Sequence, residues 1–102
     1  MDVPITHVLL LGAILFAVGV VGLLTRRNLV VLFLCVELML NAANLTFLAF
    51  ARENRSLDGQ VVVFLVIALA AVEAAVGLAL VIAVWRTHGT LDIDRLRRLK
   101  DS

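Results

Sequence analysis

The chain has 102 residues, 63% of them hydrophobic and 17% charged, and its formal net charge is +1. A soluble domain of this size cannot hide so much apolar surface, so the composition predicts a protein whose natural solvent is lipid. Because Cys35 is the single cysteine, an internal disulfide, a CxxC redox pair and a cysteine-ligated cluster are all excluded.

Three long apolar segments follow one another along the chain. They cover residues 5–25, 29–51 and 61–85. At 1.5 Å per residue each helix would be about 31 Å long or longer, and the hydrocarbon core of a bilayer is about 30 Å thick. The sequence therefore predicts an all-α integral membrane protein, with three transmembrane helices in a single domain that spans residues 1–102. No metal-ligand spacing, phosphate-binding loop or nucleophile motif is present, so we expect no cofactor or metal on this chain.

The connections and the tail carry most of the charge. The first connection, residues 26–28, is so short that the first two helices must form an antiparallel hairpin. If the N-terminus lies outside, the inner side receives Arg26, Arg27 and the basic tail, which leaves only Arg52 and Arg55 outside. The positive-inside rule therefore predicts an outside N-terminus and a cytoplasmic C-terminus. The basic residues of the tail, residues 86–102, are Arg86, Arg95, Arg97, Arg98 and Lys100.

Part of this tail has the pattern of an amphipathic segment. Ile93, Leu96 and Leu99 recur at helical spacing beside basic residues. The pattern fits a short helix on the membrane surface. It fits a solvated, partly disordered tail as well, so the sequence leaves both open.

Two acidic residues, Glu37 and Glu73, each lie alone in the middle of an apolar segment. A carboxylate at the centre of a bilayer costs at least about 2.5 kcal/mol, and such residues usually carry a proton or an ion, or pair with a group that does. The alternative is a protonated glutamate that forms a hydrogen bond to a neighbouring helix and serves packing alone. Two such residues in one short chain favour the functional interpretation.

The surroundings of the two acids differ. Glu37, Asn41 and Asn44 lie at i, i+4 and i+7 on one helical face, which should face protein or water rather than lipid. The amides can form hydrogen bonds between helices, order water beside the acid, or do both. Glu73 shares its face with Ala70 and Gly77, whose small size lets another helix approach closely. A second smooth face, for which close packing is the stronger interpretation, is formed by Gly12, Gly19 and Gly22.

The predicted topology places the two carboxyls at similar depths. Glu37 lies about 12 Å from the inner end of its helix, and Glu73 about 18 Å from the same side. Carboxyls that are level within about 6 Å can form a proton relay through a few water molecules. Because Glu37 has the amides on its own helix, we expect it to matter more than Glu73.

At these residues the chain resembles the K subunit family of the proton-pumping NADH:quinone oxidoreductase, respiratory complex I. The resemblance covers nearly the whole chain, and the first helix and the tail are its least specific parts. The matching stretches read RRNL, VELMLNAANL, DGQV and AAVEAAVGL at residues 26–29, 36–45, 58–61 and 70–78.

The resemblance implies a non-redox subunit of an enzyme complex in the cell inner membrane. Glu37 and Glu73 would belong to a chain of charged groups along the membrane arm, and Arg26 and Arg27 would support coupled activity from the inner loop. The implied partners are the H, A, J and N subunits and the lipid bilayer, with no nucleic acid. NADH, FMN, the iron–sulfur clusters and quinone would be bound elsewhere in the complex.

Other functions remain open at the level of the sequence. The C subunit of multisubunit cation/proton antiporters has the same plan of three helices, although the second glutamate within Ala-Ala-Val-Glu-Ala favours complex I. A small multidrug exporter resembles a four-helix chain with its key glutamate in the first helix, and the rotor subunit of ATP synthase resembles a two-helix hairpin. A purely structural assembly subunit, with both acids protonated and inert, is the alternative from another functional class.

Overall fold

Four helices make up the protein in a computed structural model, which describes residues 3–55 and 57–101 and, of residues 100 and 101, the backbone alone. Three of them are long and apolar enough to cross a membrane, and every regular element of the described chain is helical, which confirms the predicted all-α class. Lys100, counted above among the basic residues of the tail, has its side chain outside this description. The helices are α1 (Ile5–Thr25), α2 (Leu29–Glu53), α3 (Leu57–His88) and α4 (Ile93–Asp101).

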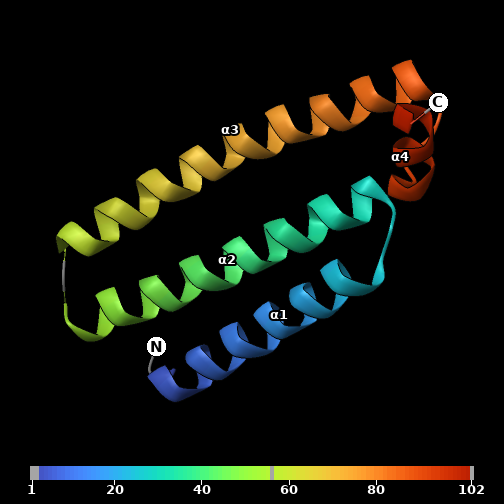
Figure 1. The fold of residues 1–102 in the computed structure, drawn as a ribbon. Coiled ribbons are helices and arrows are strands. Elements are labelled where there is room, and N and C mark those ends of the chain that lie inside the picture. Colours follow the sequence, from blue (N-terminus) through green and yellow to red (C-terminus); the bar gives the residue numbers. More distant parts are fainter. Residues whose placement is uncertain (1–2, 56, 102) are drawn as a thin grey trace.

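The three long helices run antiparallel in chain order, with α2 between α1 and α3 (Figure 1). The first hairpin has the short connection expected from the sequence. α1 ends at Thr25, and the side chain of Asn28 caps the next helix by accepting hydrogen bonds from the backbone N–H groups of Val30 (2.9 Å) and Val31 (3.3 Å). Such an N-cap satisfies donors that the first turn of α2 leaves without partners.

α3 is longer than the apolar segment that predicted it, because the helix continues past both ends of that segment. It begins at Leu57 rather than at residue 61 and ends at His88 rather than at residue 85. Asp58 in the first turn and Arg86 in the last turn have the charges that a helix dipole favours there. With 32 residues, α3 is about 48 Å long, so it must tilt or extend past a hydrocarbon core of about 30 Å.

α1 and α2 pack closely through the glycine face predicted from the sequence. A Cβ atom added to Gly19 would lie 2.5 Å from Met39 Cγ and 2.9 Å from the carbonyl oxygen of Cys35. One added to Gly12 would lie 2.8 Å from Thr46 Oγ1, and one added to Gly22 would overlap Cys35 Sγ. All three glycines therefore let the backbones of α1 and α2 approach each other, which confirms the close-packing interpretation.

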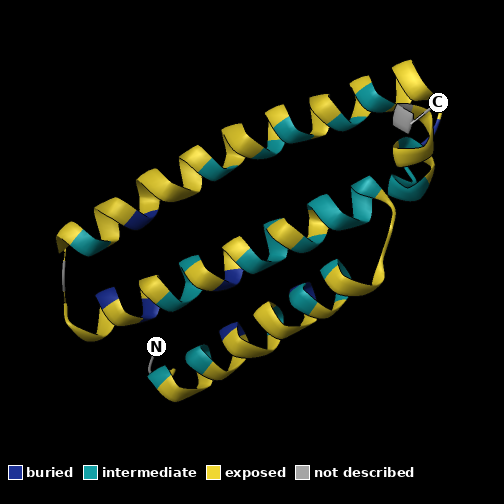
Figure 2. Ribbon diagram, in the orientation of Figure 1, coloured by how far each residue is buried: buried dark blue, intermediate teal, exposed yellow. Residues whose placement is uncertain are grey.

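α3 is packed more loosely. It contacts α2 at Gly77, where an added Cβ would overlap the ring of Phe33. Figure 2 shows that most of α3 is exposed, and only 6% of its most apolar window is buried within the chain. A membrane helix with so little cover must contact lipid or other proteins over most of its surface.

The tail contains a helix, α4, which agrees with the helical alternative left by the sequence, while its placement on a membrane surface stays a prediction. Gly89 has φ of +69°, a conformation that glycine adopts without steric cost, and its N–H bonds to the carbonyl of Trp85 at 2.8 Å. The chain can therefore leave α3 and turn back, which places α4 at the same end of the bundle as the connection between α1 and α2 (Figure 1).

Candidate functional site: the α2–α3 face and the inner loop

The contact between Phe33 and Gly77 fixes the register of α2 against α3. Glu37 follows Phe33 by one helical turn, and Glu73 precedes Gly77 by one turn. Because the two helices are antiparallel, these steps lead in the same direction along the bundle. The two glutamates therefore lie at one level, in agreement with the depths worked out from the sequence.

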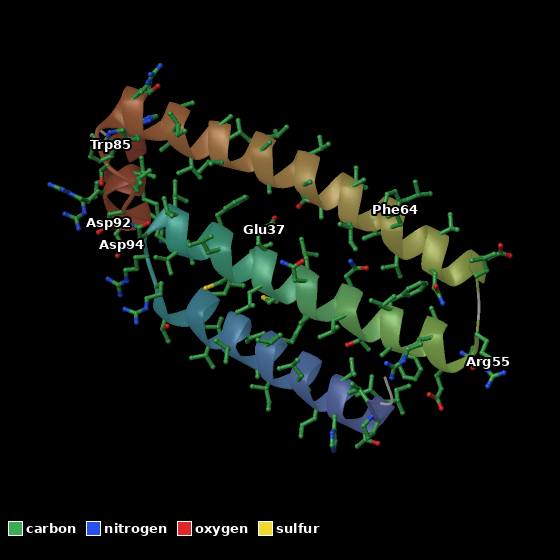
Figure 3. All side chains as sticks on the ribbon, turned by 180° about the vertical axis from the view of Figure 1, so that it is seen from behind. Glu37, Arg55, Phe64, Trp85, Asp92 and Asp94 are labelled. Atoms are coloured by element: carbon green, nitrogen blue, oxygen red, sulfur yellow. The ribbon has the colours of Figure 1, made fainter. Side chains whose placement is uncertain are left out.

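Glu37 has an oxygen that the protein neither exposes nor satisfies. Its side chain lies on the side of α2 that faces α3 (Figure 3), and Oε1 is buried without a hydrogen-bond partner among the described residues. Buried polar atoms are nearly always satisfied, and leaving one without a partner costs about 1–3 kcal/mol. The missing partner must come from water or from a neighbouring protein.

A cavity of about 290 Å³ opens between α2 and α3 beside the glutamates. Asn41 and Asn44 line it from α2, and Glu73 lines it from α3, among mainly apolar side chains such as Phe47 and Val66. Glu37 does not line the cavity; it lies one helical turn before Asn41 in α2. The two amides thus face the same space as Glu73, whereas the sequence pattern had grouped them with Glu37 alone.

Glu73 itself is exposed in this chain, as is Asn41, while Asn44 is half-buried. The cavity has room for several water molecules, and its amides and carboxyl can both donate and accept hydrogen bonds to them. Chemically, the α2–α3 face can therefore hold water beside the carboxyl of Glu73, one helical turn from Glu37. Among the described residues, no three His, Cys, Asp or Glu side chains gather closely enough to hold a metal ion.

The connection between α1 and α2, which contains Arg26 and Arg27, is joined to the tail, and sequence reasoning missed this contact. The N–H of Leu29 donates to the carbonyl of Leu91, and the N–H of Ile93 donates to the carbonyl of Arg27, both at 2.9 Å. Arg27 also forms an ion pair with Asp94 at 2.8 Å, and the side chains of Arg26 and Arg27 are both exposed.

Each of the two paired segments lies at the start of a helix. The residues that cap these helices were the signal that the sequence offered. Asn28 caps α2, and Asp92 caps α4 by accepting from the N–H groups of Asp94 (2.9 Å) and Arg95 (3.4 Å). The two caps pair as an antiparallel bridge. A capping residue just before an amphipathic pattern predicts where α4 begins, but neither segment indicates its partner, because more than 60 residues separate them.

Comparison with known proteins gives matches over nearly the whole chain. A family model described as NADH-ubiquinone/plastoquinone oxidoreductase chain 4L matches residues 7–101. NADH-quinone oxidoreductase subunit K of Anaeromyxobacter sp. (strain K) is 55% identical over 98 residues, which cover 96% of this chain and 99% of that protein. The proteins of the same name from Thermomicrobium roseum and Roseiflexus castenholzii are each 53% identical, over 98% and 96% of this chain and 98% of each relative.

Proposed function

The chain belongs to the NADH-ubiquinone/plastoquinone oxidoreductase chain 4L family, the K subunits of NADH-quinone oxidoreductase, and on that premise we propose that Glu37 and Glu73 carry protons through the membrane arm of this enzyme. The observation that carries the proposal is the unpartnered, buried Oε1 of Glu37, level with Glu73 across the α2–α3 interface. A structural acid would be expected to have a fixed hydrogen-bond partner, whereas a proton carrier needs one that comes and goes.

In this mechanism Glu37 and Glu73 exchange protons through water that extends from the cavity beside Glu73 to Glu37, one helical turn away. Asn41 and Asn44 order that water, because an amide can bond to either protonation state of a carboxyl. Arg26 and Arg27 set the electrostatic potential at the inner end of the path. Electron transfer from NADH through FMN and the iron–sulfur clusters to quinone takes place on other subunits.

The proposal includes the placement of the chain. Its K-type relatives are subunits of an enzyme complex, so other subunits of that complex are its partners. We propose that the neighbours are of the H, A, J and N types, in the plasma membrane, with the N-terminus outside and α4 on the cytoplasmic side. The basic inner loop and tail support this orientation.

The size of the expected effect follows from the cost of charge in lipid. Without the Glu37 carboxyl, an excess proton must cross this level as a cation in water, at a cost of at least about 2.5 kcal/mol. That cost corresponds to a rate lower by about 70-fold. We therefore expect Glu37→Gln to leave about 1–2% of coupled quinone reduction and proton pumping, and Glu73→Gln to leave a partial activity.

The experiment measures NADH-driven pumping in membrane vesicles, normalised to assembled complex by the oxidation of NADH with an artificial acceptor. Glu53→Gln is the matched control, since Glu53 is exposed at the far end of the same helix. Glu37→Asp should recover some function because it restores a titratable group. Full pumping by an assembled Glu37→Gln complex would refute the relay, and a loss explained by lower abundance would assign Glu37 a structural role.

A further inference from the structure

α4 is fixed against the end of the bundle rather than free in solution. Its start is held by the bridge between Asn28 and Asp92 and by the ion pair between Arg27 and Asp94. Thr90, only 9% exposed, adds a hydrogen bond, because its Oγ1 accepts from the N–H of Asp92 at 3.1 Å. The side chains on α4 therefore have a defined place relative to the end of α3.

This arrangement creates a basic hollow of about 440 Å³ between the end of α3 and α4. His88, Arg95 and Arg98 supply its polar wall, and Gly89, Thr90 and Leu99 complete it. The two nearby carboxylates whose side chains the structure describes are already engaged, since Asp92 caps α4 and Asp94 pairs with Arg27 on the loop (Figure 3 labels both). The Arg27–Asp94 pair is the only salt bridge among the side chains that the structure describes, so the hollow has an excess of positive charge.

An apolar groove of about 320 Å³ lies beside the last turns of α3. It is lined by Leu78, Val81, Ile82 and Trp85 of α3 together with Val30 and Leu91. Val81, Trp85 and His88 lie at i, i+4 and i+7, so the groove and the basic hollow succeed each other along one face of α3. Trp85 is 54% exposed there, which suits an indole at the boundary between hydrocarbon and headgroups.

We propose that this end of the protein binds an anionic phospholipid, with its phosphate between Arg95, Arg98 and His88 and an acyl chain along the groove beside Trp85. Guanidinium groups bind phosphate oxygens through paired hydrogen bonds, and basic pockets at the ends of membrane helices suit anionic headgroups. A free phosphate would use only the hollow, whereas a lipid uses both the hollow and the apolar groove. The proposal goes beyond proton transfer and does not depend on it.

The test uses the purified enzyme complex in nanodiscs of phosphatidylcholine with a trace of a phosphatidylglycerol probe that carries a photoreactive acyl chain. We expect the probe to label this subunit, with cross-links mapped by mass spectrometry to residues 78–91. Each basic side chain near an anionic headgroup contributes about fivefold to binding, so Arg95→Gln with Arg98→Gln should lower labelling by between about fivefold and 25-fold. Arg86→Gln with Arg97→Gln is the matched control, since both residues are exposed at the same end but do not line the hollow. Because these two side chains do not line the hollow, the control should change labelling less than Arg95→Gln with Arg98→Gln does.

Three results would overturn the proposal. They are equal loss of labelling in the two double variants, equal labelling of the wild-type complex by a phosphatidylcholine probe, and displacement of the probe by millimolar inorganic phosphate, which would indicate a site for soluble anions. The last two measurements use the wild-type complex, so they decide the question even where a variant assembles poorly.

Discussion

Gly19 packs against the turn of α2 that contains Glu37, so the Gly19→Ala variant tests how that turn is held. The added Cβ would lie 2.5 Å from Met39 Cγ and 2.9 Å from the carbonyl oxygen of Cys35. Met39 has a flexible side chain and can move, but the carbonyl belongs to the backbone of α2. The helices must therefore separate by about 0.5 Å before that oxygen reaches ordinary contact with the new methyl group.

The direction of the effect distinguishes packing from helix propensity. Overpacking of this kind costs about 1–3 kcal/mol, whereas glycine to alanine within a helix gains about 1 kcal/mol when nothing is in the way. We expect a net loss of up to about 2 kcal/mol for Gly19→Ala and a larger loss for Gly19→Leu. Met39→Ala should restore only part of the stability, since the carbonyl clash remains.

The assay is the amount of assembled complex on native gels, together with the temperature at which half of the NADH-quinone reductase activity is lost. Gly12→Ala is the control, because its added Cβ meets the hydroxyl of Thr46 at 2.8 Å but lies 3.4 Å from the nearest backbone atom. It should cost less than Gly19→Ala. A Gly19→Ala complex as stable as the wild type, or more stable, would refute the packing argument.

Three further predictions concern the loop, the tail and α3. Replacement of Arg26 and Arg27 by Ala should lower quinone reductase activity at unchanged complex abundance, and Lys at both positions should retain it; a loss that parallels abundance would leave only a topological role. Asp94→Asn breaks an exposed ion pair, so the free energy of unfolding should fall by about 1 kcal/mol or less. Limited proteolysis of the tail should become faster. Gly77→Ala should lower coupled activity by pressing on Phe33, and Phe33→Ala in the same chain should restore it; no restoration would contradict the contact.

The sequence predicted the elements that hydrophobicity controls. An apolar segment longer than the bilayer is thick must form a helix in lipid, because no other structure of a single segment satisfies its backbone groups. The glycine spacing on α1 likewise predicted a close contact, since small residues on one face serve little else. The ends of α3 were predicted less well, because helix there depends on the charges of Asp58 and Arg86 and on Gly89 rather than on apolar residues.

The contacts of the tail with the loop and the lining of the cavity were beyond prediction for a different reason. The bridge between Asn28 and Asp92 uses backbone groups, and backbone groups leave no pattern in the sequence that identifies a distant partner. The grouping of Asn41 and Asn44 with Glu73 depends on how α3 sits against α2. Periodicity states which residues of one helix share a face, but it does not state what that face meets.

The unsatisfied oxygen of Glu37 and the exposure of Glu73 have a common physical consequence. Glu37 belongs to α2 and Glu73 to α3, and the most apolar window of each helix is only 6% buried within this chain. In lipid alone, the exposed carboxyl and the amides of the cavity would lack partners, at a cost that membrane helices avoid. Because the chain is a subunit of a complex, a neighbouring subunit is the natural cover for this face. The polar groups on the α2–α3 face are therefore best understood as one side of a polar interface that a second protein completes.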